Sequence, residues 1–227
     1  NMKAHSFIYL IIYSCFIMSV SLQAQEHFAD RYNVSYITMD DGLPHNFIDD
    51  IYKDTRGFLW ISTAGGGLSR YDGYEFIHFN PNTPHSKLKS NFIHNVYEDR
   101  FHRLWIVSEG GTDIIDLSTL QSVIPNDPKG LLPRFINHPT YIVILDSQGC
   151  IWLQCDNALH RISFNTEGDI DTLSTLDLPE QDEPDLILKD IDEDGKIWTG
   201  INGTIYKITP TPQGQLEKSS ISEQLIF

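Results

Sequence analysis

Carboxylates and histidines are the side chains through which this sequence could carry out acid–base chemistry. The nearest approach to a glycosidase pair is in the adjacent acids Asp40/Asp41 and Asp49/Asp50. Glycosidases hold two carboxyls about 5 to 9.5 Å apart across the bond that they cleave, and adjacent residues do not span a cleft. The nine histidines show no metal-ligand spacing, and the GxSxG, HExxH and nucleotide-binding motifs are absent. We therefore predict no catalytic residue, no metal and no cofactor.

Two short motifs resemble ion-binding loops but have simpler explanations. Residues Asp190 to Gly195 match the opening of a calcium loop, yet position 12 of such a loop would be Ile201, which cannot supply the required carboxylate. Gly65–Gly67 is glycine-rich, but it lies between two predicted strands and no helix follows it. Tight turns are the favoured interpretation of both, with calcium as the weaker alternative at the first.

Asparagine, histidine and acidic side chains also suit the binding of sugar hydroxyls, and aromatic rings can stack on a sugar face. Residues of these types occur before predicted strands and in turns. The candidate ligand-binding residues are Asn46, Phe47, Asn91, Phe92, His94, Glu109, Asp156 and Asn157. Turn and strand-start residues with structural hydrogen bonds are the alternative interpretation of each one.

Bulk composition narrows the class of partner. The chain has 227 residues, of which 41% are hydrophobic and 21% charged, as in a soluble globular domain. Its formal net charge is −15. Nucleic acids and anionic membrane surfaces attract basic proteins, so neither is expected as the main partner.

The amino-terminal residues have the order of a secretory signal peptide. Lys3 precedes the apolar run Phe7–Val20, and small residues lead to Ala24. An uncleaved membrane anchor is the alternative, but the run of 14 residues is shorter than the roughly 20 that span a bilayer. We predict a signal peptide over residues 1–24 and export to the periplasm. Cys150 and Cys155 lie beyond it, and two small buried residues are favoured over a disulfide.

All four tryptophans occupy equivalent places in a repeat. They are Trp60, Trp105, Trp152 and Trp198, spaced by 45, 47 and 46 residues. Six residues before each lies an aspartate: Asp54, Asp99, Asp146 and Asp192. Three residues before each lies Gly57, Gly149 or Gly195, with His102 as the exception in the second copy. A period of this length indicates stacked structural units.

The first copy reads as four short strands. Residues 47–52 and 58–62 flank the turn Asp54–Gly57, where the aspartate side chain can accept backbone N–H groups and glycine allows a positive φ. Residues 68–71 and 74–79 flank the hairpin signal Asp72-Gly73. Four antiparallel strands in 40 to 50 residues form a β-propeller blade, and the tryptophans are then packing anchors between blades.

We therefore predict an all-β chain of four four-stranded antiparallel repeats that form β-propeller blades. The propeller region is expected over residues 25–227, with repeats at approximately 41–85, 86–135, 136–180 and 181–227. The candidate ligand-binding residues would then share one rim. That rim is formed by the loops before the innermost strands and by the turns between second and third strands.

The stretch DDGLPHNFIDDIYKDTRGFLWISTAGGGLSRYDGYEFIHF resembles the repeat of the two-component regulator propeller. The similarity is close over Asp41 to Phe79, good over Asn91 to Leu117 and weaker in the later copies, which keep Asp, Gly and Trp. The resemblance implies a non-enzymatic periplasmic sensor of hybrid two-component systems. In these systems the propeller precedes a transmembrane helix, a histidine kinase and a DNA-binding regulator, and senses glycan breakdown products.

Family sensors usually carry two propellers of about seven blades, so four repeats predict a fragment of a larger propeller, truncated before its kinase. A strand at Val34–Met39 is expected to complete the last blade of a ring. Exposed blade edges predict self-association, for example as a dimer, and membrane attachment is expected only through a downstream segment. A structural or protein-interaction propeller is the main alternative function, and a glycan-active propeller enzyme is a weaker one.

Overall fold

The computed structural model describes residues 35–84, 87–132, 136–155, 157–178, 187–192, 195–201, 204–211 and 214–220. The chain divides into two units, residues 1–37 and 38–227. The predicted signal peptide over residues 1–24 lies outside the described residues. Within the described ranges, no helix has the length and apolar character needed to cross a membrane.

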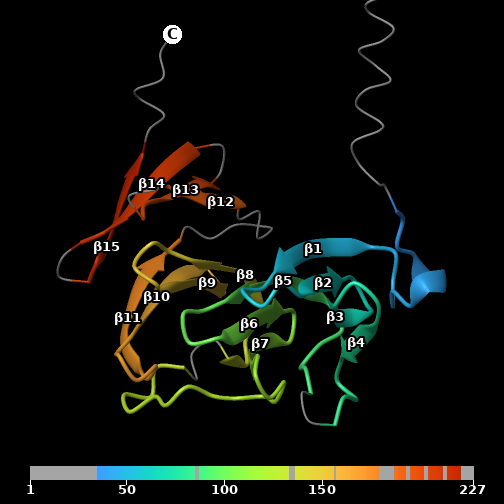
Figure 1. The fold of residues 1–227 in the computed structure, drawn as a ribbon. Coiled ribbons are helices and arrows are strands. Elements are labelled where there is room, and N and C mark those ends of the chain that lie inside the picture. The colour runs from blue at the N-terminus through green and yellow to red at the C-terminus, as the bar shows by residue number, and fades with distance from the viewer. Residues whose placement is uncertain are drawn as a thin grey trace, which may run out of the picture. The chain divides into compact units, whose positions relative to one another are not determined.

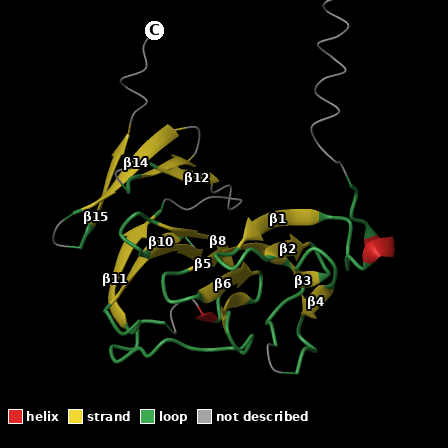
Figure 2. Cartoon of the chain, in the orientation of Figure 1, coloured by secondary structure: helices red, strands yellow, loops and turns green. Residues whose placement is uncertain are grey.

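Strands and loops make up almost all of the described chain, in four antiparallel sheets (Figures 1 and 2). The first sheet contains β1 (Ile48–Lys53), β2 (Leu59–Thr63), β3 (Gly67–Tyr71) and β4 (Phe76–Phe79). The second contains β5 (Ile93–Glu98), β6 (Arg103–Ser108) and β7 (Gly111–Asp116). The third contains β8 (Thr140–Leu145), β9 (Ile151–Cys155), β10 (Ala158–Phe164) and β11 (Ile170–Asp177). The fourth contains β12 (Ile187–Ile191), β13 (Ile197–Ile201), β14 (Thr204–Pro210) and β15 (Leu216–Ser220).

Each sheet is a meander in which strands adjacent in sequence pair with each other. This is the blade topology predicted from the repeat, and the predicted all-β fold of stacked propeller blades is confirmed. Short turns allow it, because antiparallel neighbours need only a few residues to reverse the chain.

The turn between the first and second strands is organised by one buried aspartate. In the first sheet, Asp54 Oδ1 accepts hydrogen bonds from the backbone N–H groups of Arg56 at 3.0 Å and Phe58 at 2.9 Å. Its Oδ2 accepts the indole Nε1–H of Trp60 at 2.9 Å. Gly57 takes a φ of 93° in the same turn, a conformation that glycine adopts without steric cost. The carboxylate therefore fixes both the turn and the tryptophan.

The other three sheets repeat this arrangement. The indole-to-carboxylate distances are 2.9 Å for Trp105–Asp99, 2.9 Å for Trp152–Asp146 and 3.0 Å for Trp198–Asp192. Asp192 also accepts the backbone N–H of Lys196 at 2.9 Å. Asp192, which belongs to the calcium-like sequence Asp190–Gly195, is therefore a structural residue of a turn.

Three of the tryptophans pack between consecutive sheets, as predicted. Trp60 lies in a buried cluster with Val96 and Leu104 of the second sheet. Trp105 similarly contacts a cluster of third-sheet residues, and Trp152 one of fourth-sheet residues. Each sheet thus buries its face against the next one, which is how a blade that cannot form a core alone gains stability.

Two details differ from the sequence prediction. The second sheet has three strands instead of four. After β7, Ser122 forms an isolated bridge to Ile115, and farther along Leu132 and Ile136 pack in the core between the second and third sheets. Among the described residues, this segment pairs with β7 through a single bridge instead of a fourth strand.

The strand predicted at Val34–Met39 is also wrong over its described part. Residues 35–38 form no strand, and Met39–Asp41 is a 3-10 helix. Thr38 and Asp41 form a capping box at its start, and Gly42 ends it with a φ of 104°. These caps satisfy the local backbone groups within the segment itself, and no strand partner is needed.

Cys150 and Cys155 stand at the two ends of the β9 region and both are buried, which confirms the interpretation as small buried residues. No disulfide joins them. Burial, with a smaller contribution from Asp146, raises the pKa of the Cys150 thiol to about 11. Because the thiolate is the reactive species, this cysteine is held in its inert form.

We expect Asp54→Ala to lower the free energy of unfolding by about 2 to 5 kcal/mol, because it leaves the buried indole N–H of Trp60 and two part-buried backbone N–H groups without an acceptor. Urea denaturation followed by circular dichroism measures the change. Asp72→Ala is the matched control, since Asp72 accepts two backbone N–H groups in an exposed turn of the same sheet. An equal loss in the two variants would show that burial of the Asp54 carboxylate is unimportant.

We also expect Cys150 to resist alkylation in the folded chain at neutral pH. A pKa raised from 9.0 to about 11 lowers the thiolate fraction about 100-fold. Iodoacetamide labelling followed by peptide mass spectrometry should find the Cys150 peptide unmodified in buffer and modified in concentrated urea. Comparable labelling under the two conditions would contradict the assigned environment.

Candidate functional site

Most of the predicted ligand-binding residues gather at one rim of the sheets, which we call the strand-start rim. It consists of the residues that lead into the first strands of the sheets and the turns between second and third strands. The turn between β2 and β3 ties the first two sheets together here. Ala64 N–H donates to the Phe47 carbonyl at 3.1 Å, and the N–H groups of Gly65 and Gly67 donate to the Asn91 carbonyl at 3.1 and 2.9 Å.

The aromatic rings of this rim are accessible. Phe47 is 68% exposed and Phe92 is 48% exposed. The Phe92 ring lies over Gly65, 3.8 Å from the place where a Cβ would stand. Glu109, in the turn between β6 and β7, donates its N–H to the Phe92 carbonyl at 3.4 Å. The Phe92 ring and the main chain of Phe47 thus border the same turn.

The remaining predicted residues are placed less closely. Asn46 is exposed and directly precedes Phe47. Asn157 belongs to the equivalent turn of the third sheet, where its carbonyl accepts the N–H of Leu178 at 2.7 Å. Asp156 lies outside the described residues. The structure therefore brings together Phe47, Asn91, Phe92 and Glu109, while Asn157 takes part in a separate contact.

His94 connects this rim to the third sheet. Its ring lies 5.4 Å from the ring of Tyr141, centroid to centroid. Its Nε2 atom is buried and has no hydrogen-bond partner among the described residues. Burial lowers the pKa of His94 from its ordinary 6.5, while the nearby carboxylates of Glu109 and Asp49 oppose the shift. The imidazole is therefore uncharged at neutral pH and can both donate and accept one hydrogen bond.

A β-bulge recurs at this point in three first strands. The register shifts between Ile48 and Asp50 in β1, between Ile93 and Asn95 in β5, and between Thr140 and Ile142 in β8. The extra residues at the three bulges are Asp49, His94 and Tyr141. Bulges re-aim side chains and are enriched next to functional sites.

Sequence reasoning identified His94 but missed Asp49 and Tyr141 as its neighbours. Asp49 was considered only as one of two adjacent acids. Their position in the repeat could have identified them from the sequence. All three bulge residues lie 11 positions before the tryptophan of their repeat.

The residue after each of the first two bulges holds adjacent sheets in place. Asp50 Oδ2 accepts the backbone N–H of Val96 at 3.4 Å, and burial raises the pKa of Asp50. Asn95 exchanges two hydrogen bonds with the backbone of Val143, at 3.0 and 3.1 Å. These bonds align β1 with β5 and β5 with β8, and so bring the three bulge residues side by side.

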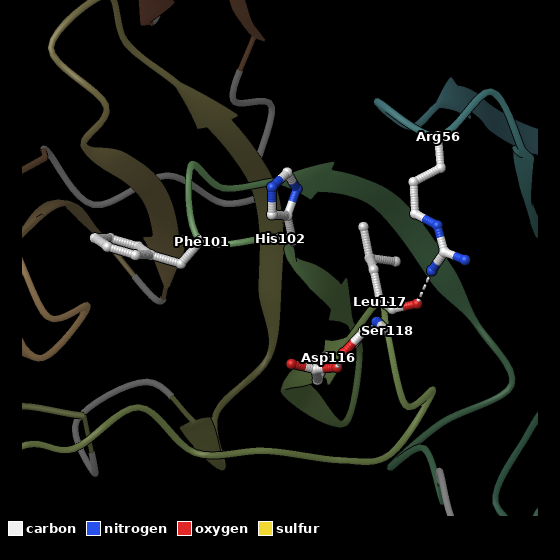
Figure 3. A pocket seen from close by; sticks show the side chains of 6 residues that line it. All are labelled: Arg56, Phe101, His102, Asp116, Leu117 and Ser118. Carbon is white, nitrogen blue, oxygen red and sulfur yellow. Dashed lines mark hydrogen bonds between the residues drawn. The ribbon is translucent and has the colours of Figure 1, made fainter.

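A hollow of about 360 Å³ lies elsewhere, at the turns between first and second strands (Figure 3). Its lining residues are Arg56, Phe101, His102, Asp116, Leu117 and Ser118. None of them was predicted as a site residue. The available signal was His102, which occupies the place of a glycine in the other three repeats and keeps a positive φ of 58°.

The polar groups around this hollow are engaged in structural bonds. The Arg56 guanidinium donates to the Leu117 carbonyl (Figure 3). His102 Nδ1 lies 2.8 Å from Glu98 Oε1. The hydroxyl and the backbone N–H of Thr55 each donate to Glu98 at 2.7 Å. The hollow thus lies beside the hydrogen bonds that link the first and second sheets.

Glu98 is only 3% exposed, and it accepts the hydrogen bonds from Thr55 that link the two sheets. Burial alone would raise the pKa of Glu98, but the hydrogen bonds from Thr55 and His102 outweigh it, and the pKa is lowered from 4.5. The charged form of Glu98 therefore stabilises the contact between sheets.

Comparison with known proteins agrees with the blade assignment. Residues 42–65 and 87–110 match the two component regulator propeller family. Each matched segment extends from before a first strand to the turn after a second strand. No curated protein sequence matches the chain.

Solved structures with a similar fold include extracellular domains from B. thetaiotaomicron. One, assigned to a hybrid two component system, is 24% identical with a TM-score of 0.53, over 80% of this chain and 25% of that chain. A second such domain is 17% identical with a TM-score of 0.54, over 82% and 32%. Virginiamycin B lyase from Staphylococcus aureus is 16% identical with a TM-score of 0.51, over 76% and 55%. These likenesses show the propeller fold, and the chain spans only part of each of these proteins.

We expect Glu98→Gln to destabilise the chain at neutral pH, because the charged acceptor of the hydrogen bonds that link the two sheets is lost. A lowered carboxyl pKa contributes stability above the unfolded-state value, near 4.5, and this contribution is lost as the pH falls through the folded-state value. Urea midpoints should therefore differ between wild type and variant at pH 7 and converge at strongly acidic pH. A constant difference across this range would contradict the role of the charge.

Proposed function

We propose that this chain is a periplasmic ligand-sensing propeller module of a two-component signal-transduction protein, and that the strand-start rim binds the ligand. The observation that carries the proposal is the position of the family repeats. Residues 42–65 and 87–110 contain six of the eight predicted site residues. The predicted signal peptide and the extracellular origin of the similar B. thetaiotaomicron domains support the periplasmic location.

An oligosaccharide is the ligand class that we propose. The rim offers two exposed aromatic rings, Phe47 and Phe92, on which the apolar face of a sugar can lie. Asn46, Asn91 and Glu109 lie in the same rim segments and carry amide and carboxylate groups that suit sugar hydroxyls. Apolar surface with a few convergent polar groups is the usual composition of a small-ligand site.

In this proposal the chain binds and does not catalyse. Ligand contacts at the rim would stabilise one arrangement of neighbouring sheets over another, because a ligand shifts a conformational equilibrium only through its differential affinity. The kinase that responds would belong to a part of the protein outside this sequence.

One observation favours a second candidate, a propeller enzyme. The strand-start rim places the uncharged His94 near Asp49 and Glu109, and a neutral imidazole beside carboxylates can act as a general base. Virginiamycin B lyase shows that a similar fold can carry an enzyme activity. Product analysis by mass spectrometry after incubation with oligosaccharides distinguishes the two, since a sensor releases its ligand unchanged.

We expect an oligosaccharide panel to raise the melting temperature of the full chain, because a ligand that binds only the folded state stabilises it. Phe92→Ala should weaken the affinity for the active member at least about 5-fold, the loss that accompanies removal of an aromatic anchor. Isothermal titration calorimetry measures the affinity.

Tyr74→Ala is the matched control, since Tyr74 is 92% exposed in the turn between β3 and β4, which is not part of the rim. It should leave the affinity unchanged. If no member of the panel shifts the melting temperature, a structural or protein-interaction propeller becomes the better explanation.

A further inference from the structure

The three contacts between consecutive sheets are built alike. In each, the tryptophan of one sheet packs in a buried cluster with two residues of the next sheet. One of the two directly precedes the tryptophan of its own sheet, and the other is its partner on the third strand. These pairs are Leu104 with Ile115, Ile151 with Ile162, and Ile197 with Ile208, and all six residues are fully buried. We call the two sides of such a contact the tryptophan face and the receiving face.

The first sheet has a receiving face that is left open. Leu59 and Tyr71 are the equivalent pair, and both are only partly buried. Ile51 on β1 and Val96 on β5 each lie nine positions before the tryptophan of their repeat. Val96 is 1% exposed in the contact between the first two sheets, whereas Ile51 is 60% exposed. Among the described residues, an apolar face of the same kind is therefore not covered by a sheet.

The fourth sheet has a tryptophan face that is also left open. Trp198 is partly exposed, whereas the tryptophans of the other three sheets are fully buried. Ile205 is 46% exposed on β14, on the strand that pairs with that of Trp198. Leu68 and Leu159 occupy the same place in the first and third sheets and are 0% and 1% exposed. The described residues thus include one tryptophan face and one receiving face without a neighbour.

The segment before β1 is compatible with a sheet docked on the open receiving face. Leu43 in this segment and Leu88 in the segment before β5 both lie 17 positions before the tryptophan of their repeat. Leu88 is buried in the cluster between the first and second sheets, together with Trp60. A leucine at this place is therefore an ordinary part of the contact between two sheets.

From this arrangement we propose that the tryptophan face of the fourth sheet docks on the receiving face of the first sheet in a second copy of the chain. Such a contact continues the one that already joins the four sheets. Neither face covers the other within one chain, because Ile51 and Ile205 are both exposed. Contacts between unlike faces form closed rings when the rotation closes. Two copies of four sheets lie within the typical range of about 4 to 8 blades for a propeller ring.

Sedimentation-velocity ultracentrifugation of the full chain over a concentration series tests the proposal, and a two-chain species that dissociates on dilution is expected. Ile51→Asp and Ile205→Asp each place a charge in one of the two faces. Each variant should weaken the assembly at least about 30-fold, the loss that accompanies removal of an interface anchor. Both residues are exposed in the single chain, so the circular dichroism spectrum of each variant should match that of the wild type.

A mixture of the two variants tests that the contact joins unlike faces. Ile51→Asp leaves the tryptophan face intact, and Ile205→Asp leaves the receiving face intact. An equimolar mixture should therefore form a two-chain species at a total concentration at which each variant alone is a monomer. A contact between like faces would give no such recovery, and its absence would overturn the head-to-tail arrangement.

Ile124→Asp is the matched control, because Ile124 is 74% exposed in the loop after β7 and lies on neither face. It should leave the assembly unchanged. A monomeric wild type, or an equal effect of Ile124→Asp, would overturn the second copy as the occupant of these faces. A species that grows beyond two chains with concentration would contradict closure of the ring. Ligand binding at the strand-start rim is measured separately, so these outcomes leave the proposed function standing.

Discussion

A single hydrogen-bond arrangement underlies every sheet of this protein. One carboxylate, buried in the first three sheets, accepts backbone N–H groups of the first turn through one oxygen and an indole N–H through the other, as Asp54 does with Phe58 and Trp60. Charged acceptors form stronger bonds than neutral ones, so the turn and the large side chain are fixed by the same group. The oriented indole then packs against the next sheet, and local turn chemistry determines how blades stack.

Stacking in turn defines two rims with different chemistry. At the rim formed by the turns between first and second strands, Glu98 accepts hydrogen bonds from Thr55 of the neighbouring sheet and lies beside His102 of its own sheet. The polar groups there are already engaged in structural bonds. At the strand-start rim, Asp50 and Asn95 align the first strands through backbone bonds. Of the bulge residues beside them, Asp49 is exposed, while His94 and Tyr141 are partly buried. The Glu98 contact and the candidate ligand-binding residue His94 thus lie at opposite ends of β5.

The tryptophan period predicted the blades because large residues repeated at nearly equal spacing, three of them fully buried, leave few alternative folds. It could not predict the three described strands of the second sheet, where the chain after β7 forms only an isolated bridge at Ser122 within the described residues. Nor could it predict the 3-10 helix at Met39–Asp41, which local caps stabilise. At the site, residue type identified His94, but its neighbours Asp49 and Tyr141 depend on bulges. Those bulges appear only when the strands are in register.

The hydrogen bonds from Asp50 and Asn95 end on main-chain atoms of the following sheet. A main-chain partner is present whatever the side chain at that position, so these particular bonds need no matching substitution in the following sheet. Duplication of a repeat that carries such a residue would therefore preserve this part of the contact between blades. Evolution could change the number of blades in such proteins by copying alone, and adapt the rim residues afterwards.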